Sequence, residues 1–161
     1  MTIVGRNIDG KNAAPEMIFR NYSLMLKAHM NTLYDRIGGH DGISKLLRHF
    51  YADVRQDPLI GPIFNAQIKD WKSHLEIIAS FWEALIGGPR SYSRPMPMRH
   101  ARLPLLAEHF ERWLFLWQAN CRAQLPADAA QEMIHLAGHI GHRLRIILGI
   151  STVPASKTAE N

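Results

Sequence analysis

Hydrophobic residues recur along this chain with the spacing of one helical face. Between residues 41 and 56 they fall at i, i+3, i+4, i+7, i+8 and i+11, and the row consists of Ile43, Leu46, Leu47, Phe50, Tyr51 and Val54. Such a row is typical of an amphipathic helix packed on a core, and Asp41 is expected to cap its start. Asp57 and Pro58 predict its end.

Three more segments follow the same rule. A helix over 70–88, closed by Gly87 and Gly88, is predicted to turn inward Trp71, His74, Ile78, Phe81 or Trp82, and Leu85. A helix over about 105–123 aligns Phe110, Trp113, Leu114, Trp117 and Cys121. A last helix over about 128–148 aligns Met133, Leu136, Ile140, Leu144 and Ile147. No strand-like alternation occurs, so the sequence predicts an all-α fold.

The remaining segments are expected to be irregular or to extend the domain. Connectors cover 59–65 and 89–104, and the run Pro95–Met96–Pro97 is expected to prevent a regular helix. An N-terminal extension covers 1–30, with a helix predicted over 16–30 after Pro15. The main domain is expected over 31–150, followed by a flexible polar tail over 151–161.

Composition narrows the class of protein. The 161 residues are 47% hydrophobic, which suits one globular domain, and the net charge of +5 comes from scattered Lys and Arg, so no nucleic-acid partner is expected. The single cysteine, Cys121, is expected in the core and suits a reducing compartment. Neither a signal peptide nor an apolar run of about 20 residues is recognisable, so we expect no membrane partner and a cytoplasmic protein.

Motifs of common enzymes are missing, and two groups of histidines remain as candidates for chemistry. The sequence contains no Gly-rich nucleotide loop, no CxxC, no HExxH and no GxSxG. His135, His139 and His142 share one flank of the last helix and could bind Zn²⁺ or Cu²⁺ through two or three imidazoles, although a solvated His-rich flank is the favoured interpretation. On the last-but-one helix, Glu108 and Arg112 are spaced as an i,i+4 ion pair.

The second group is His74, His100 and two inward aromatic residues. Tyr51, His74 and the indole of Trp113 all lie on apolar faces, and each alone is typical of a hydrogen-bonded core residue. Together they would also suit a pocket for a flat apolar cofactor, with His100 as an axial ligand. Spacing alone leaves both interpretations open.

Three longer segments resemble a known family. They are FYADVRQDPLIGPIFN at 50–65, DWKSHLEIIASFW at 70–82 and MRHARLPLLAEHFERWL at 98–114. In order, spacing and residue type they resemble the truncated haemoglobins, from about Leu33 to Leu148. GPIFN, WKSH and LPLLAEHF are most similar to group III, whereas GGPRSY, MRHA and Ile37–Gly38–Gly39 are more similar to group II. The resemblance implies a globin-like 2-over-2 helical sandwich with an extra N-terminal helix.

The resemblance also implies roles for single residues. His100 would be the proximal ligand of a haem iron through Nε2, its other ring nitrogen held by a backbone carbonyl. Tyr51 would be the main hydrogen-bond donor to bound O2, with Trp113 and His74 as further donors. The haem pocket would be lined by Phe50, Phe64, Ile78, Phe81, Trp82, Met96, Met98 and Arg99, the last near a haem propionate.

On this basis we expect a globin with haem b (iron protoporphyrin IX) that reversibly binds or transports O2 and also binds CO and NO. Redox chemistry on the ligand is an open question. NO dioxygenation, peroxide reduction and nitrite reduction, served by an unidentified reductase, are the candidates. A monomer and a homodimer both stay open. The alternatives are a haem-free helical interaction or sensor module and a His-rich metal-binding protein.

Overall fold

The computed structural model of the protein describes residues 32–150, and within them the chain forms helices and no strand. The helix predicted over 16–30 and the tail over 151–161 lie outside the described residues. The helices are α2 (Leu33–Arg36), α3 (Gly39–Gln56), α4 (Gly61–Gln67), α5 (Trp71–Ile86), α6 (Met96–His100), α7 (Ala107–Gln124) and α8 (Ala127–Ile147).

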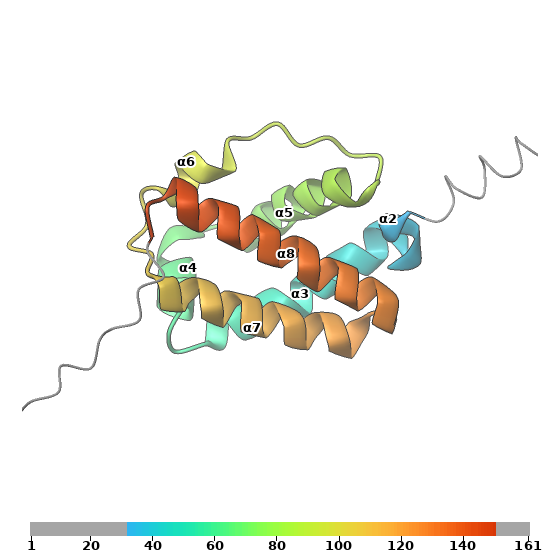
Figure 1. The fold of residues 1–161 in the computed structure, drawn as a ribbon, viewed down its shortest axis with the longest axis horizontal. Helices are drawn as coiled ribbons and strands as arrows, with labels where there is room; N and C mark the ends of the chain where they lie inside the picture. Colours follow the sequence, from blue (N-terminus) through green and yellow to red (C-terminus); the bar gives the residue numbers. More distant parts are fainter. Residues whose placement is uncertain (1–31, 151–161) are drawn as a thin grey trace, which may run out of the picture.

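Two helix pairs build the body of the molecule (Figure 1). Helix α7 packs along α8, α3 packs against α5, and α3 also contacts α7, so the pairs share one core. The predicted all-α fold is confirmed. Among the described helices, none is long and apolar enough to cross a membrane.

The hydrophobic row of α3 is buried as predicted, but the helix begins earlier than expected. All six residues of the row belong to the core. The N-cap is Gly38, whose φ of 90° suits glycine, and Asp41 lies inside the first turn, so its prediction as N-cap was wrong. Gly42 lies so close to the Ile37 carbonyl oxygen that a Cβ would come within 1.7 Å of it. Close backbone packing thus sets this helix start.

Both segments expected to be irregular contain a short helix. Residues 61–67 form α4, with Pro62 in its first turn, and residues 96–100 form α6, with Pro97 in its first turn. The prediction failed because a proline interrupts a helix only where its missing N–H would have bonded to the preceding turn. In the first turn that N–H has no partner within the helix.

Two inward rows differ from the prediction at their ends. On α5 the buried row runs through Trp82 and Ile86, so Leu85 is 43% exposed instead of inward. On α8 the buried row reaches Leu144, and Ile147 is 59% exposed. Each helix has one face toward the core, and at about 100° per residue a neighbour one position off this row points to solvent.

The ion pair predicted between Glu108 and Arg112 is replaced by a longer-range one. Arg112 Nε lies 2.6 Å from Oδ2 of Asp57, whose side chain is only 2% exposed. Asp57 Oδ1 also accepts the backbone N–H groups of Leu59 and Ile60, each at 3.0 Å. Arg112 therefore ties α7 to the turn between α3 and α4, because a buried carboxylate attracts it more strongly than the exposed Glu108.

Candidate functional site

Tyr51 lies in the interior among aromatic rings from three helices. It is 5% exposed, and its ring centroid lies 5.9 Å from that of Phe64, 5.8 Å from that of Trp71 and 5.7 Å from that of His74. The ring of Phe50, next in sequence, packs edge-on at 4.9 Å. Helical periodicity on α3 explains the position, since Tyr51 belongs to the buried row of this helix.

The indole of Trp113, on α7, approaches the Tyr51 hydroxyl and lowers its pKa, as a donated hydrogen bond does. An indole N–H can only donate, so the phenol oxygen accepts and its own O–H stays free to donate. Burial raises the pKa of Tyr51 well above its ordinary value, and the bond from Trp113 only partly offsets this. The hydroxyl is therefore protonated at physiological pH and is a hydrogen-bond donor inside the protein.

His74 carries a buried polar atom with no partner. Its Nε2 is shielded from solvent and forms no hydrogen bond within the part of the chain that the structure describes. Burial lowers the pKa of His74, and the neighbouring His100 lowers it further, so the ring is neutral at pH 7. A buried polar group without a partner costs about 1–3 kcal/mol. Such an atom, on a ring that packs against the Tyr51 ring, indicates a place where the chain receives a further group.

His100 is the last residue of α6 and is half-buried. Its Nδ1 lies 2.8 Å from the backbone oxygen of Met96. A carbonyl only accepts, so Nδ1 carries the proton and Nε2 keeps its lone pair in the neutral ring. Metal-binding histidines are commonly oriented in this way, by a backbone carbonyl on the second ring nitrogen. The ring is therefore prepared to bind a metal through Nε2.

The residues predicted to line the haem pocket differ in how deeply they are buried. Phe50 and Trp82 are buried, and Phe64, Ile78 and Phe81 pack against the core from partly exposed positions. Trp117 stacks between Trp82 and Trp113, with centroids 4.6 and 5.6 Å away and rings within 9° of parallel. The wall next to Trp113 is thus a rigid aromatic stack.

The predicted residues around His100 lie closer to the surface. Met96 is half-buried, Met98 is 69% exposed, and Arg99 is exposed. A polar rim beside an apolar interior suits a ligand with one apolar and one charged edge. Their contacts with haem stay predictions.

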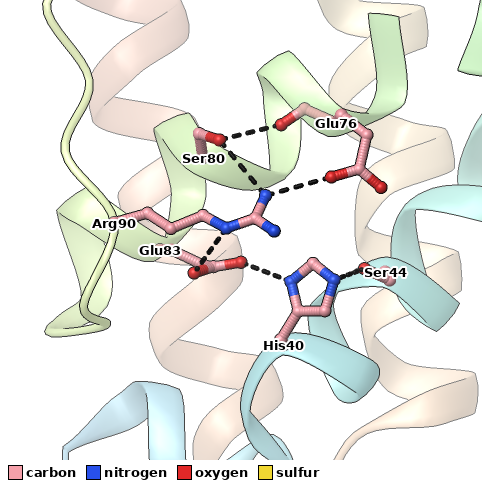
Figure 2. A network of polar contacts seen from close by, with 6 residues as sticks. All are labelled: His40, Ser44, Glu76, Ser80, Glu83 and Arg90. Atoms are coloured by element: carbon pink, nitrogen blue, oxygen red, sulfur yellow. Dashed lines mark hydrogen bonds and ion pairs between the residues drawn. The ribbon is translucent and has the colours of Figure 1, made fainter. Parts of the chain in front are cut away.

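A network of polar contacts fixes the segment that leads into α6 (Figure 2). Glu83 of α5 is 1% exposed, and its carboxylate oxygens lie 2.7 Å from His40 Nδ1 and 3.7 Å from Arg90 Nε. Arg90 also contacts Glu76 at 3.0 Å and Ser80 at 3.4 Å. The network joins the start of α3, the second half of α5 and the connector before α6, so one end of that connector is held by a buried charge.

The remaining residues singled out from the sequence are the histidine group on α8 and the cysteine. His135 and His139 are exposed and have Nε2 atoms 2.8 Å apart, whereas the exposed His142 does not join them. Between residues 32 and 150, no three His, Cys, Asp or Glu side chains are grouped as metal ligands. A site of three histidines is therefore wrong. Cys121 is fully buried, as predicted, and burial raises the pKa of its thiol to about 12, which makes it unreactive.

Sequence reasoning turned Trp71 inward but gave it no part in the site, and it missed Glu83. Trp71 packs on both Tyr51 and His74, and the guanidinium of Arg55 lies 4.8 Å above its ring. Glu83, at the centre of the polar network, follows Trp82 directly in the buried face. A usable signal existed for Glu83, because a carboxylate within an apolar row of a helix requires a cation from elsewhere.

The class of protein that this fold and these residues define is the haem-binding globin. The model of the bacterial-like globin family matches residues 32–143, and the chain belongs to this family. Membership implies a haem cofactor, and the donors fit one. His100 presents a ring nitrogen that the Met96 carbonyl leaves free, and His74 presents a buried polar atom without a partner among the described residues.

Individual relatives agree with this assignment. The chain is 33% identical over 121 residues to the group 3 truncated hemoglobin ctb of Campylobacter jejuni, covering 63% of this chain and 94% of that protein. The crystal structure of a group III truncated hemoglobin from Campylobacter jejuni superposes with a TM-score of 0.64 at 30% identity, over 68% of this chain and 91% of the other. The X-ray structure of a thermostable hemoglobin from Thermobifida fusca superposes with a TM-score of 0.62 at 29% identity, over 70% of this chain and 95% of the other. The expected truncated-globin fold of two helix pairs is thereby confirmed.

Proposed function

We propose that this globin binds haem b through Nε2 of His100 and reversibly binds O2, and also CO and NO, beside Tyr51, His74 and Trp113. The observation that carries the proposal is the buried set formed by the free Tyr51 O–H and the unpartnered His74 Nε2. His74 Nε2 has no partner among the residues that the structure describes, and the Tyr51 hydroxyl lies in the same apolar interior, so a small ligand that enters there would meet both polar groups.

The proximal role of His100 rests on its tautomer. The bond from Nδ1 to Met96 keeps the proton off Nε2 and fixes the orientation of the ring. When bound, haem supplies an iron atom that takes up diatomic gases and shifts electron density onto O2. Met96, Met98 and Arg99 are proposed to contact its edge, with Arg99 paired to a propionate.

The distal role belongs to three donors of different strength. Tyr51 donates its hydroxyl proton to O2 in the pocket, and Trp113 supports it because its N–H occupies the phenol oxygen. Neutral His74 offers either a donor or a lone pair at Nε2, depending on its tautomer. Phe50, Phe64, Ile78, Phe81 and Trp82 exclude water, which strengthens each of these hydrogen bonds.

Redox chemistry on the ligand is a second candidate function. Three polar groups around one ligand exceed what simple storage requires, which favours NO dioxygenation, peroxide reduction or nitrite reduction with a separate reductase. These reactions differ in the electron donor they need. Single-turnover kinetics with each substrate would separate them from reversible O2 binding.

The decisive experiment is optical titration of the purified protein with haem, for the natural chain, His100→Ala and the control His49→Ala. His49 is an exposed residue of α3 and should not affect haem. We expect a strong Soret band and stoichiometric haem in the natural chain and control. His100→Ala should lose haem, and added imidazole should partly restore it. Full haem with an unchanged ferrous spectrum in His100→Ala would refute the proximal role. A colourless natural chain would favour the haem-free module.

A further inference from the structure

A second pair of histidines lies outside the haem pocket, on the exposed face of α8. His135 and His139 are four residues apart, so they stand one turn above the other on the same side of the helix. Their Nε2 atoms are 2.8 Å apart, and their ring planes meet at 84° with centroids separated by 4.3 Å. Both rings are exposed to solvent. The pair does not share a residue with the set around Tyr51 and His100.

The two facing nitrogen atoms can coexist in two ways. If one of the two Nε2 atoms carries a proton, they form a single hydrogen bond, which contributes little net free energy because water competes for both groups. If both rings carry their proton on Nδ1, both Nε2 atoms present lone pairs to the space between the rings, and a cation bound to both would remove their repulsion. Neutral imidazole is the commonest metal ligand in proteins. The pair therefore has the chemistry of a chelate.

The separation of the nitrogens discriminates between metals. Metal–imidazole bonds are about 2.0–2.1 Å long. Two such bonds at 90° place their nitrogens about 2.8–3.0 Å apart, and two bonds at the tetrahedral angle place them about 3.3–3.4 Å apart. The 2.8 Å that the free pair holds as a hydrogen bond is also the separation that the right angle of a square-planar or tetragonal ion requires, so such an ion would bind without moving the rings apart. Cu²⁺ prefers this geometry and also binds nitrogen ligands most tightly of the divalent first-row ions.

We propose that His135 and His139 form a chelating surface site for Cu²⁺. Water would complete the coordination, because the neighbouring Glu132 is already bound to Arg36 at 2.6 Å. A hollow of about 330 Å³ beside the pair is lined by Gln131, Glu132, His135 and Leu136, and it leaves room for such waters. The site is independent of haem binding.

The test is calorimetric titration of the untagged ferric holoprotein with Cu²⁺ and, separately, Zn²⁺, together with copper EPR. We expect one tight equivalent of Cu²⁺, weaker Zn²⁺ binding and hyperfine lines from two nitrogens. His135→Gln and His139→Gln should each weaken this equivalent about 100-fold, because loss of one imidazole removes the gain from joint binding. His142→Gln should bind as the natural chain does.

A register variant keeps the number of imidazoles and removes their proximity. In His139→Gln with Arg143→His, the second ring moves to a position eight residues from His135, about 12 Å along the helix. Arg143 is exposed, so folding should be unaffected, which the haem spectrum and circular dichroism would check. Tight copper binding in this variant, unchanged binding in His135→Gln, Zn²⁺ binding tighter than Cu²⁺, or a spectrum with one nitrogen would each overturn the proposal.

Discussion

Replacing Tyr51 with phenylalanine removes one oxygen atom from the interior and leaves the ring in place. The hydroxyl accepts from Trp113, so its O–H is free for a ligand, and the Tyr51 ring packs on Phe50 and Phe64 in contacts that phenylalanine keeps. O2 on ferrous haem carries partial negative charge, so the lost hydrogen bond is charge-assisted. Such a bond contributes about 1.5–3 kcal/mol, or roughly 10- to 150-fold in an equilibrium constant.

Most of this loss should appear as faster O2 dissociation, measured by stopped-flow, because the bond forms after the ligand enters. CO carries less charge, so its dissociation should change much less. Tyr92→Phe is the matched control, since Tyr92 packs on Phe81 at the edge of the core and not on His74. The freed N–H of Trp113 could donate in place of Tyr51 and reduce the effect. A change in O2 dissociation below about threefold would refute Tyr51 as the principal donor.

Three further predictions concern buried polar groups. Burial alone would raise the pKa of Asp57, but its hydrogen bonds, including that from Arg112, hold this pKa below its usual range. Asp57→Asn should therefore cost about 2 kcal/mol of unfolding free energy at pH 7. The difference from the natural chain should vanish as the pH falls below about 4, because Asp57 then becomes protonated. Glu83→Gln should lower the unfolding free energy by about 1–3 kcal/mol in denaturant titrations, because His40 and Arg90 lose the buried carboxylate that they contact. No change would mean that the network is not stabilising. The pKa of His74 is lowered in the folded chain, so the unfolded chain binds this proton more tightly. Acidification from pH 7.5 to 5.5 should therefore destabilise the natural chain more than His74→Gln. Equal losses of stability in thermal melting would contradict the lowered pKa of His74.

The candidate site was predictable where it depends on helical register. Tyr51 and Trp113 belong to rows whose spacing alone turns them inward, and both pack in the core because two amphipathic helices meet there, Tyr51 buried and Trp113 partly buried. His100 could be singled out by its place on a proline-rich connector and by resemblance to a family. The resemblance also implied that a backbone carbonyl holds its other ring nitrogen, but the identity of that carbonyl could not be predicted, because Met96 reaches Nδ1 only when the connector forms a short helix.

What the sequence alone determined is the set of long helices and the side that each turns to the core, since periodicity is a local property summed over many residues. The tertiary structure decided which distant groups meet. Arg112 chose Asp57, 55 positions away, over its helical neighbour Glu108, and Glu83 found its partners on α3 and on the connector. It also left Nε2 of His74 without a partner beside Tyr51 and brought His135 within 2.8 Å of His139 but not of His142. These outcomes depend on packing angles and on competition between charges in a low-dielectric interior, which no local pattern encodes.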